Sequence, residues 1–129
     1  MMLNDKAKAL LDKPKQFATI PTIEPDGRPQ RRVVWYVRHR HDRPGSTVAD
    51  RRKHKNMVRD PRVTLLVYDA ENPYTYVEIR GRVEMTTEGG RELIDDLARA
   101  YMGADRYTMD DGTDNVRVVC RIVAEKVVS

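Results

Sequence analysis

The segment of residues 74–85 alternates between apolar and polar side chains. Successive side chains of a β-strand point to opposite faces of a sheet, so alternation predicts a long, half-exposed strand. Gly81 interrupts the pattern and predicts a bend, since a glycine inside a strand often marks one. The two faces divide into Val77, Ile79, Val83 and Met85 on the apolar side and Tyr76, Glu78, Arg80, Arg82 and Glu84 on the polar side.

Five further segments predict strands, and most of their connections are short: residues 17–23, 30–38, 46–48, 63–68 and 116–128. The turn at 24–29 contains Asp26-Gly27, which tolerates positive φ, so the first two strands are expected to form a hairpin. Residues 63–68 are almost continuously apolar, which predicts a central strand buried on both faces. About six strands joined in this way favour an antiparallel barrel.

Three helices are expected around this sheet, which makes the chain mainly β in an α+β arrangement. Asn4 is a candidate N-cap for a short first helix that ends at Pro14. A second helix covers residues 51–59 and stops before Pro61, because proline cannot continue a helix. Thr86 or Thr87 is the expected cap of a third helix, whose apolar stripe reaches its end at Gly103.

The length of 129 residues suits one domain, 1–129, with a single core. The net charge of +4 favours anionic partners without choosing among them. Cys120 is the single cysteine, so an internal disulfide is excluded. The sequence contains no apolar run long enough for a membrane span and no signal-peptide pattern, so a cytoplasmic protein is expected. His39 and His41 lack an evident third metal ligand, and an exposed loop is expected there.

Residues 46–63 combine hydroxyl and basic side chains in an order typical of an anion site. Ser46 and Thr47 end a short strand, and a run of cations follows from Arg51 onward. Hydroxyl groups beside cations on the first turns of a helix favour phosphate. Lys53 is the strongest candidate, because its stem can reach back to the strand end. Without further support, the basic run would instead be interpreted as a solvated helix face.

Several motifs, taken together and in order, resemble a known family: Phe17 to Ile20, Asp26 to Gln30, Val34 to Tyr36, Ser46-Thr47 with residues 51–56, Asp60 to Val63, and Glu78 to Arg82. The chain resembles the split-barrel flavin-binding proteins related to pyridoxamine 5′-phosphate oxidase. It is most similar to the branch that uses the deazaflavin coenzyme F420. It departs from that branch at residues 39–45, where a basic turn replaces most of an apolar strand.

The resemblance implies a six-stranded antiparallel split β-barrel with flanking helices, and a homodimer with cofactor sites at the subunit interface. Residues 33–35 would line the cofactor ring, and residues 72–76 of the partner subunit would close the site. Trp35 could equally serve as core or interface. The cofactor-binding residues implied by the resemblance are Ser46, Thr47, Val48, Ala49, Asp50, Arg51, Lys53, Val34, Trp35 and Tyr74.

The resemblance implies an oxidoreductase that uses reduced F420 to transfer a hydride to a small organic acceptor, which nothing in the sequence identifies. FMN in the same site is a close variant. Such cofactors carry the chemistry themselves, so the lack of an evident catalytic dyad is compatible with this function. A proton donor could be Tyr36, Tyr74, Tyr76 or water. The sequence also leaves open a non-catalytic cofactor carrier and a basic nucleic-acid-binding module, although the scarcity of interleaved aromatic residues disfavours nucleic acid.

Overall fold

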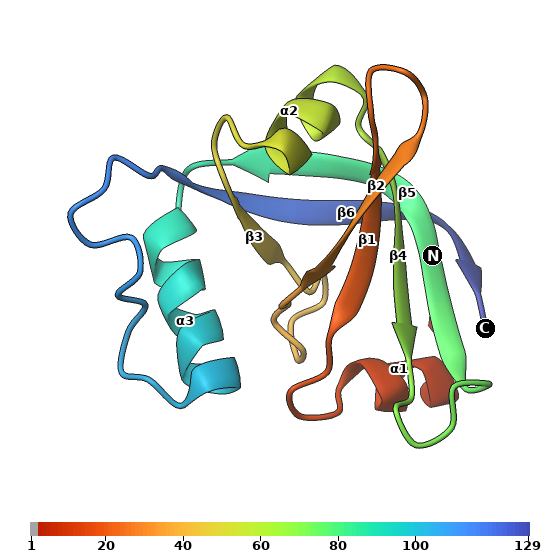
Figure 1. The fold of residues 1–129 in the computed structure, drawn as a ribbon. Helices are drawn as coiled ribbons and strands as arrows, with labels where there is room; N and C mark the ends of the chain where they lie inside the picture. Colours follow the sequence, from red (N-terminus) through yellow and green to blue (C-terminus); the bar gives the residue numbers. More distant parts are fainter. Residues whose placement is uncertain (1–2) are drawn as a thin grey trace.

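The computed structural model describes residues 3–129, which form one curled antiparallel sheet with three helices around it (Figure 1). The strand order is β2-β1-β4-β5-β6-β3. This confirms the predicted mainly β, six-stranded split barrel. The elements are α1 (Asp5–Leu11), β1 (Ala18–Ile23), β2 (Pro29–Val34), β3 (Gly45–Val48), α2 (Arg52–Arg59), β4 (Arg62–Tyr68), β5 (Tyr76–Thr86), α3 (Gly90–Met102) and β6 (Arg117–Val128).

The two edge strands, β2 and β3, meet at one end only. An isolated bridge joins Tyr36 to Gly45, and the Val37 N–H donates to the Pro44 carbonyl at 3.0 Å. The prediction that the second strand continues to Arg38 was wrong, because pairing with β1 stops at Val34. Beyond that point the chain leaves β1 and crosses to β3. The barrel is therefore closed at this corner and open along the rest of the β2–β3 edge.

Gly81 lies where β5 and β6 bend together, which confirms the predicted bend. A Cβ on Gly81 would lie 2.0 Å from the Val123 carbonyl oxygen, a distance that no side chain can adopt. The pairing register shifts between Arg80 and Gly81, as expected where β6 carries one extra residue. The bend lets the two longest strands curve around the core.

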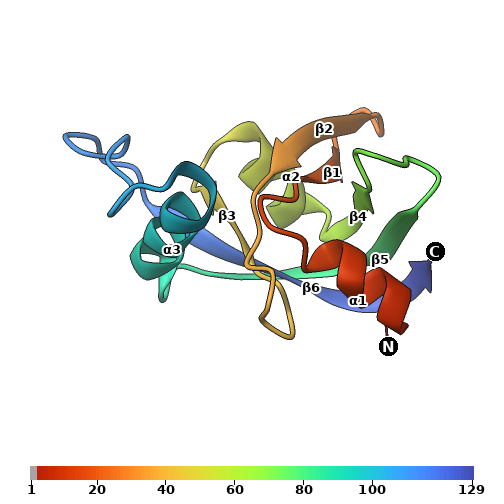
Figure 2. The ribbon, with the colours of Figure 1, turned by 90° about the horizontal axis from the view of Figure 1, so that it is seen from below.

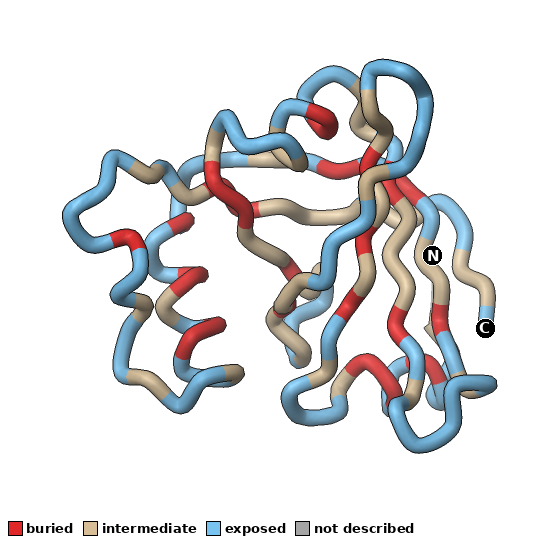
Figure 3. Tube along the Cα trace, viewed as in Figure 1, coloured by how far each residue is buried: buried red, intermediate tan, exposed pale blue. Residues whose placement is uncertain are grey.

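The core is divided among the helices, which cover different parts of the sheet (Figure 2). One cluster lies under α1 and a second lies beneath α2, where Met57 packs with Val63 and Val83. A third joins α3 to β6 through Leu93, Leu97 and Val119, and Figure 3 shows the buried positions along one face of α3. β4 is central as predicted, but its residues 64–66 are only half-buried, so burial on both faces was overestimated.

Most of the predicted helix ends are confirmed: α2 ends at Arg59, before Pro61, although α1 already ends at Leu11, ahead of Pro14. The Asn4 side chain accepts the Ala7 N–H at 2.8 Å, as expected of an N-cap. Gly103 ends α3 with φ +66°, also as predicted. The predicted threonine cap of α3 was wrong: the Thr86 hydroxyl accepts the Glu88 N–H at 3.1 Å, in a turn that precedes the helix. The helix starts after Gly89, which has φ +79°.

Candidate anion-binding groove

A groove of about 180 Å³ lies where the end of β2, β3, α2, α3 and β6 converge, and we refer to it as the anion groove. It brings together four of the ten predicted cofactor-binding residues, namely Val34, Trp35, Ser46 and Lys53. They come from the end of β2, from β3 and from α2, and the crossing of the chain from β2 to β3 brings the first two elements together. The other residues that line the groove are Val33, Ile94, Leu97, Tyr107 and Arg117.

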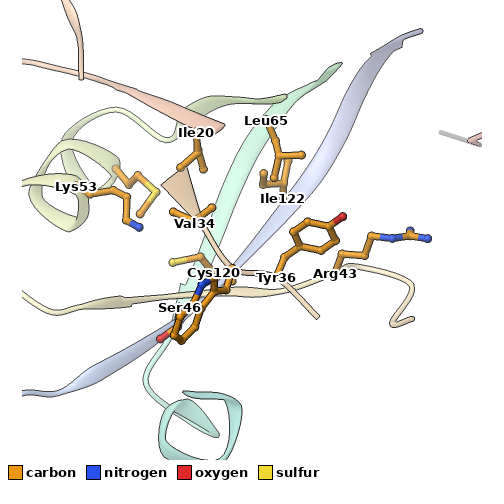
Figure 4. A pocket seen from close by; sticks show the side chains of 12 residues that line it. Ile20, Val34, Tyr36, Arg43, Ser46, Lys53, Leu65, Cys120 and Ile122 are labelled. Atoms are coloured by element: carbon orange, nitrogen blue, oxygen red, sulfur yellow. The ribbon is translucent and has the colours of Figure 1, made fainter. Parts of the chain in front are cut away.

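Lys53 lies in the first turn of α2 and extends toward Val34 and Cys120 (Figure 4). Burial lowers the pKa of its ammonium group; the neighbouring Cys120 opposes this shift, and the Arg117 and Arg32 guanidinium groups lower the pKa further. Over residues 3–129, the charged groups that shift this pKa include no carboxylate. Lys53 is therefore a half-buried cation with two arginines nearby, and an anionic ligand would stabilise its charged form.

The Ser46 hydroxyl faces the anion groove from β3, which pairs with β6 along its whole length. The preceding loop, residues 39–44, is polar as predicted, yet it is anchored to the body. Arg43 pairs with Asp12 at 2.9 Å, and Arg121 pairs with Asp42 at 2.6 Å. These ion pairs, together with the strand pairing, hold Ser46 in place although β3 is only four residues long.

Residues 47–51 connect Ser46 to α2, and none of them lines the groove. Thr47 and Val48 are buried. The Ala49 N–H donates to the Val116 carbonyl at 2.9 Å, and the Asp50 N–H donates to His54 Nδ1 at 3.0 Å. The backbone N–H of Arg51 donates to the carbonyl of Val48. Those three N–H groups already have partners within the chain, so cofactor contacts from this segment stay a prediction.

Trp35 forms a rigid apolar wall of the anion groove. Its indole stacks on the Tyr101 ring, with 5.2 Å between centroids and 12° between planes. The Tyr107 ring meets the indole edge-on at 6.5 Å. Val33, beside it, is 67% exposed at the mouth of the groove. A flat, fixed aromatic surface next to exposed aliphatic carbon suits the planar ring of a cofactor.

Residues 3–128 match the family model described as pyridoxamine 5′-phosphate oxidase. The chain belongs to the pyridoxamine 5′-phosphate oxidase family. No curated protein matches its sequence. Among solved structures, it is similar to an F420 reductase, with 27% identity over 98% of both chains and a TM-score of 0.79.

Two further solved structures show the same fold. A conserved hypothetical protein from Mycobacterium tuberculosis is 26% identical over 98% of this chain and 83% of its own, with a TM-score of 0.76. A Clostridium acetobutylicum protein of the pyridoxinephosphate oxidase family, related to general stress protein 26, is 16% identical and has a TM-score of 0.67. That alignment covers 92% of this chain and 81% of the other.

Two groove residues with polar groups, Tyr107 and Arg117, were not predicted for this pyridoxamine 5′-phosphate oxidase family member, and neither were the apolar Ile94 and Leu97 of α3. Arg117 begins β6 and lies beside Ser46, while Tyr107 comes from the polar loop between α3 and β6. Both lie outside the motifs that resemble the family. The one signal in the sequence was a loop rich in aspartate followed by an arginine, and this pattern is also typical of exposed loops.

Tyr74 lies outside the anion groove of its own chain. It belongs to the loop between β4 and β5, its side chain is 90% exposed, and its N–H donates to Asn72 Oδ1 at 3.3 Å. The expectation that Tyr74 acts on the cofactor site of a partner subunit stays a prediction.

Behind the groove, the barrel interior contains a cavity of about 30 Å³ lined by Lys53, Cys120 and Ile122 among others (Figure 4). This volume suffices for a water molecule and excludes a flavin ring. Burial raises the pKa of the Cys120 thiol to about 11, so it is protonated at neutral pH. A flavin-type cofactor would fit this chain with its ring on the exposed wall and its phosphate at Lys53 and Ser46.

Residues 3–129 were also considered for a metal site and for a membrane-spanning helix. No group of three or more histidine, cysteine or acidic side chains is placed to hold a metal ion there. None of the described helices is both long and apolar enough to cross a membrane.

Proposed function

We propose that this chain is an oxidoreductase that binds reduced coenzyme F420 and transfers a hydride to a small organic acceptor. The observation that carries the proposal is the half-buried Lys53 ammonium group, which lies near two arginines and lines the anion groove together with Ser46. The similarity to an F420 reductase over nearly the whole chain supports the choice of cofactor. FMN in the same groove is the close alternative, since it also carries a phosphate.

The protein contributes binding and orientation, while the bound cofactor supplies the hydride chemistry. Lys53 and Ser46 hold the phosphate through a charge-assisted contact and a hydroxyl hydrogen bond. Val34 and Trp35 support one face of the ring and exclude water from it. Because Trp35 is fixed by its stack on Tyr101, the ring plane is set before the acceptor binds.

We propose further that the functional unit is a homodimer. The anion groove of about 180 Å³ is smaller than the 300–1,000 Å³ or so of pockets that enclose a small molecule, so another surface is needed to cover the ring. Tyr68, Tyr74 and Tyr76 present aromatic surface at one end of the barrel, and the side chain of Tyr74 is 90% exposed. In the dimer, residues 72–76 of each subunit would close the groove of the other.

A direct binding experiment tests the cofactor assignment. F420 and FMN are titrated separately into the purified protein, and binding is followed by fluorescence quenching. Lys53→Ala is expected to weaken binding at least tenfold, because the phosphate loses its principal cation. Lys55→Ala is the matched control: this lysine lies two residues along the same helix, is exposed and does not line the groove. Failure of both cofactors to bind the wild-type protein would refute the proposal.

A further inference from the structure

We infer that Arg117 is a second phosphate-binding residue of the anion groove and that Asp110 is the residue that positions it. This inference rests on the proposed function, since it concerns the same phosphate. It extends the site from the Ser46–Lys53 segment to the loop of residues 103–116 and the start of β6. Neither residue belongs to the motifs from which the cofactor site was predicted.

The first support is the way Asp110 holds Arg117. The Arg117 Nε donates to Asp110 Oδ2 at 2.7 Å, and its Nη2 donates to Asp110 Oδ1 at 3.0 Å. Asn115 Nδ2 also donates to Oδ1 at 2.9 Å, which fixes the carboxylate. The two charged side chains are only 11% and 7% exposed. A bidentate pair this deeply buried leaves the guanidinium plane a single orientation.

The second support is the direction in which the remaining donors point. Arg117 Nη1 takes no part in the Asp110 pair and lies 3.5 Å from the Ser46 hydroxyl, the group proposed to bind phosphate. A guanidinium carries five N–H donors; Asp110 accepts two and the Ser46 hydroxyl accepts one, which leaves two available. The Tyr107 ring covers one face of the guanidinium at 4.8 Å, so an incoming anion meets its edge.

The third support is electrostatic. Asp110 offsets one positive charge, yet Arg117 still acts on Lys53 as a repelling cation across the same groove. Two cations, Lys53 and Arg117, line the groove together with Ser46, and because Asp110 offsets one of their two charges, they leave it positively charged. A phosphate oxygen placed between them satisfies both, and charge-assisted bonds of this kind are about twice as strong as neutral ones. A purely structural ion pair would have no need to border the groove.

A comparison of FMN with riboflavin isolates the phosphate, because the two differ only by that group. The dissociation constant of riboflavin divided by that of FMN measures how much the phosphate adds to binding. Arg117→Gln combined with Asp110→Asn removes the pair without leaving a buried charge unpaired, and it is expected to reduce this ratio at least fivefold. Asp110→Asn alone is expected to give a smaller reduction, because Arg117 keeps its charge and loses its fixed orientation. F420 affinity is measured in parallel on the same variants.

The outcomes separate this inference from the proposed function. If the double variant binds FMN, riboflavin and F420 as the wild type does, while Lys53→Ala loses F420 and FMN, then Arg117 has no part in phosphate binding and the proposed function stands. If the wild-type protein binds neither F420 nor FMN, both fail together. Loss of affinity for riboflavin and FMN by the same factor indicates a structural role alone and also overturns the inference.

Discussion

Trp35 stacks on Tyr101 with 5.2 Å between the ring centroids, and this contact attaches the end of β2 to α3. The Tyr101 hydroxyl donates to the Gln16 carbonyl at 2.5 Å and accepts the Tyr36 N–H at 3.3 Å. One side chain on α3 therefore binds the segment that precedes β1 and the segment that follows β2. The same stack gives the anion groove its rigid wall, so the stability of the fold and the shape of the site depend on it together.

Tyr101→Phe is expected to destabilise the protein by about 1–2 kcal/mol, because the Gln16 carbonyl and the Tyr36 N–H each lose a partner. Tyr101→Leu also removes the ring stack and should cost about 0.5–1.5 kcal/mol more. Urea unfolding followed by circular dichroism measures both. A double-mutant cycle with Trp35→Leu checks the contact itself, and additive effects of the two substitutions would contradict direct stacking.

The sequence was sufficient for features that rest on local rules. Alternation predicted β5, the interruption at Gly81 predicted its bend, and Asn4 predicted the start of α1. The end of β2 was predicted four residues too late, because the apolar run continues past Val34. Trp35 and Val37 pack against α3, while Tyr36 bridges to β3 and places its side chain in the cluster under α1. A strand pattern does not reveal which neighbour it packs against.

The candidate site was predictable only where a motif carried it. Ser46 and Lys53 lie close together in the chain, so their convergence followed from a strand leading into a helix. Arg117 reaches Ser46 across 71 positions through the pairing of β3 with β6. Its fixed orientation depends on Asp110, in an irregular loop. Contacts of this kind depend on strand order and loop geometry, which local patterns do not determine.

Gly81→Ala is expected to cost about 3 kcal/mol or more, or to prevent folding, because its Cβ would overlap the Val123 carbonyl at 2.0 Å. The nearest atoms belong to the backbone, so no rotamer change can relieve the overlap. Gly112→Ala is the control: it has φ +75° with nothing within 4 Å of the added carbon, and should cost about 1 kcal/mol. Equal thermal stability of the two variants would contradict the close approach of β5 to β6.

Acid is expected to lower the free energy of unfolding by protonating Asp60. Hydrogen bonds from Arg62 lower the pKa of this carboxyl to about 2, from an ordinary value of about 3.9. A lowered pKa means that the ionised form stabilises the folded state; this stabilisation is complete above about pH 5 and is lost as the pH falls toward 2. Asp60→Asn should make the free energy of unfolding less dependent on pH across that range, and Arg62→Gln should have a similar effect. An unchanged slope in both variants would exclude this pair as a source of acid sensitivity.

Binding of the phosphate is expected to weaken at alkaline pH through Lys53. Burial and the neighbouring arginines lower the pKa of its ammonium group below 10.5. The charged form therefore destabilises the folded protein below that lowered pKa, and the cost disappears as the pH rises through it. Phosphate needs the charged form, so the dissociation constant for FMN should begin to rise at a pH below 10.5. Lys53→Arg should keep its affinity there, because a guanidinium stays charged.

The comparison is made by fluorescence quenching at several values of pH between 7 and 10. Both proteins meet the same ligand, so the difference between their profiles reports the titration of Lys53 alone. If Lys53→Arg loses affinity over the same pH range and to the same extent as the wild type, the loss arises elsewhere and Lys53 is not the group that titrates.

Subunits with complementary defects are expected to restore a cofactor site when they are mixed. Tyr74→Ala should leave the unfolding free energy within about 0.5 kcal/mol of the wild type, because its side chain is 90% exposed, yet it should weaken F420 binding. Lys53→Ala should weaken binding from the other side of the site. In a mixed dimer, the groove that retains Lys53 meets the intact Tyr74 of the other subunit. Random pairing then gives native affinity in about a quarter of all sites.

The measurement is an F420 titration of the two variants, alone and after they have been unfolded and refolded together. A high-affinity fraction in the mixture that neither variant shows alone indicates that the site is shared between subunits. A mixture that binds only as the average of its components shows that each groove works within one chain, and a wild-type protein that is monomeric in solution at full affinity leads to the same conclusion. Either result would restrict the cofactor site to residues that converge on the groove of one subunit, with Lys53 and Ser46 at its phosphate end.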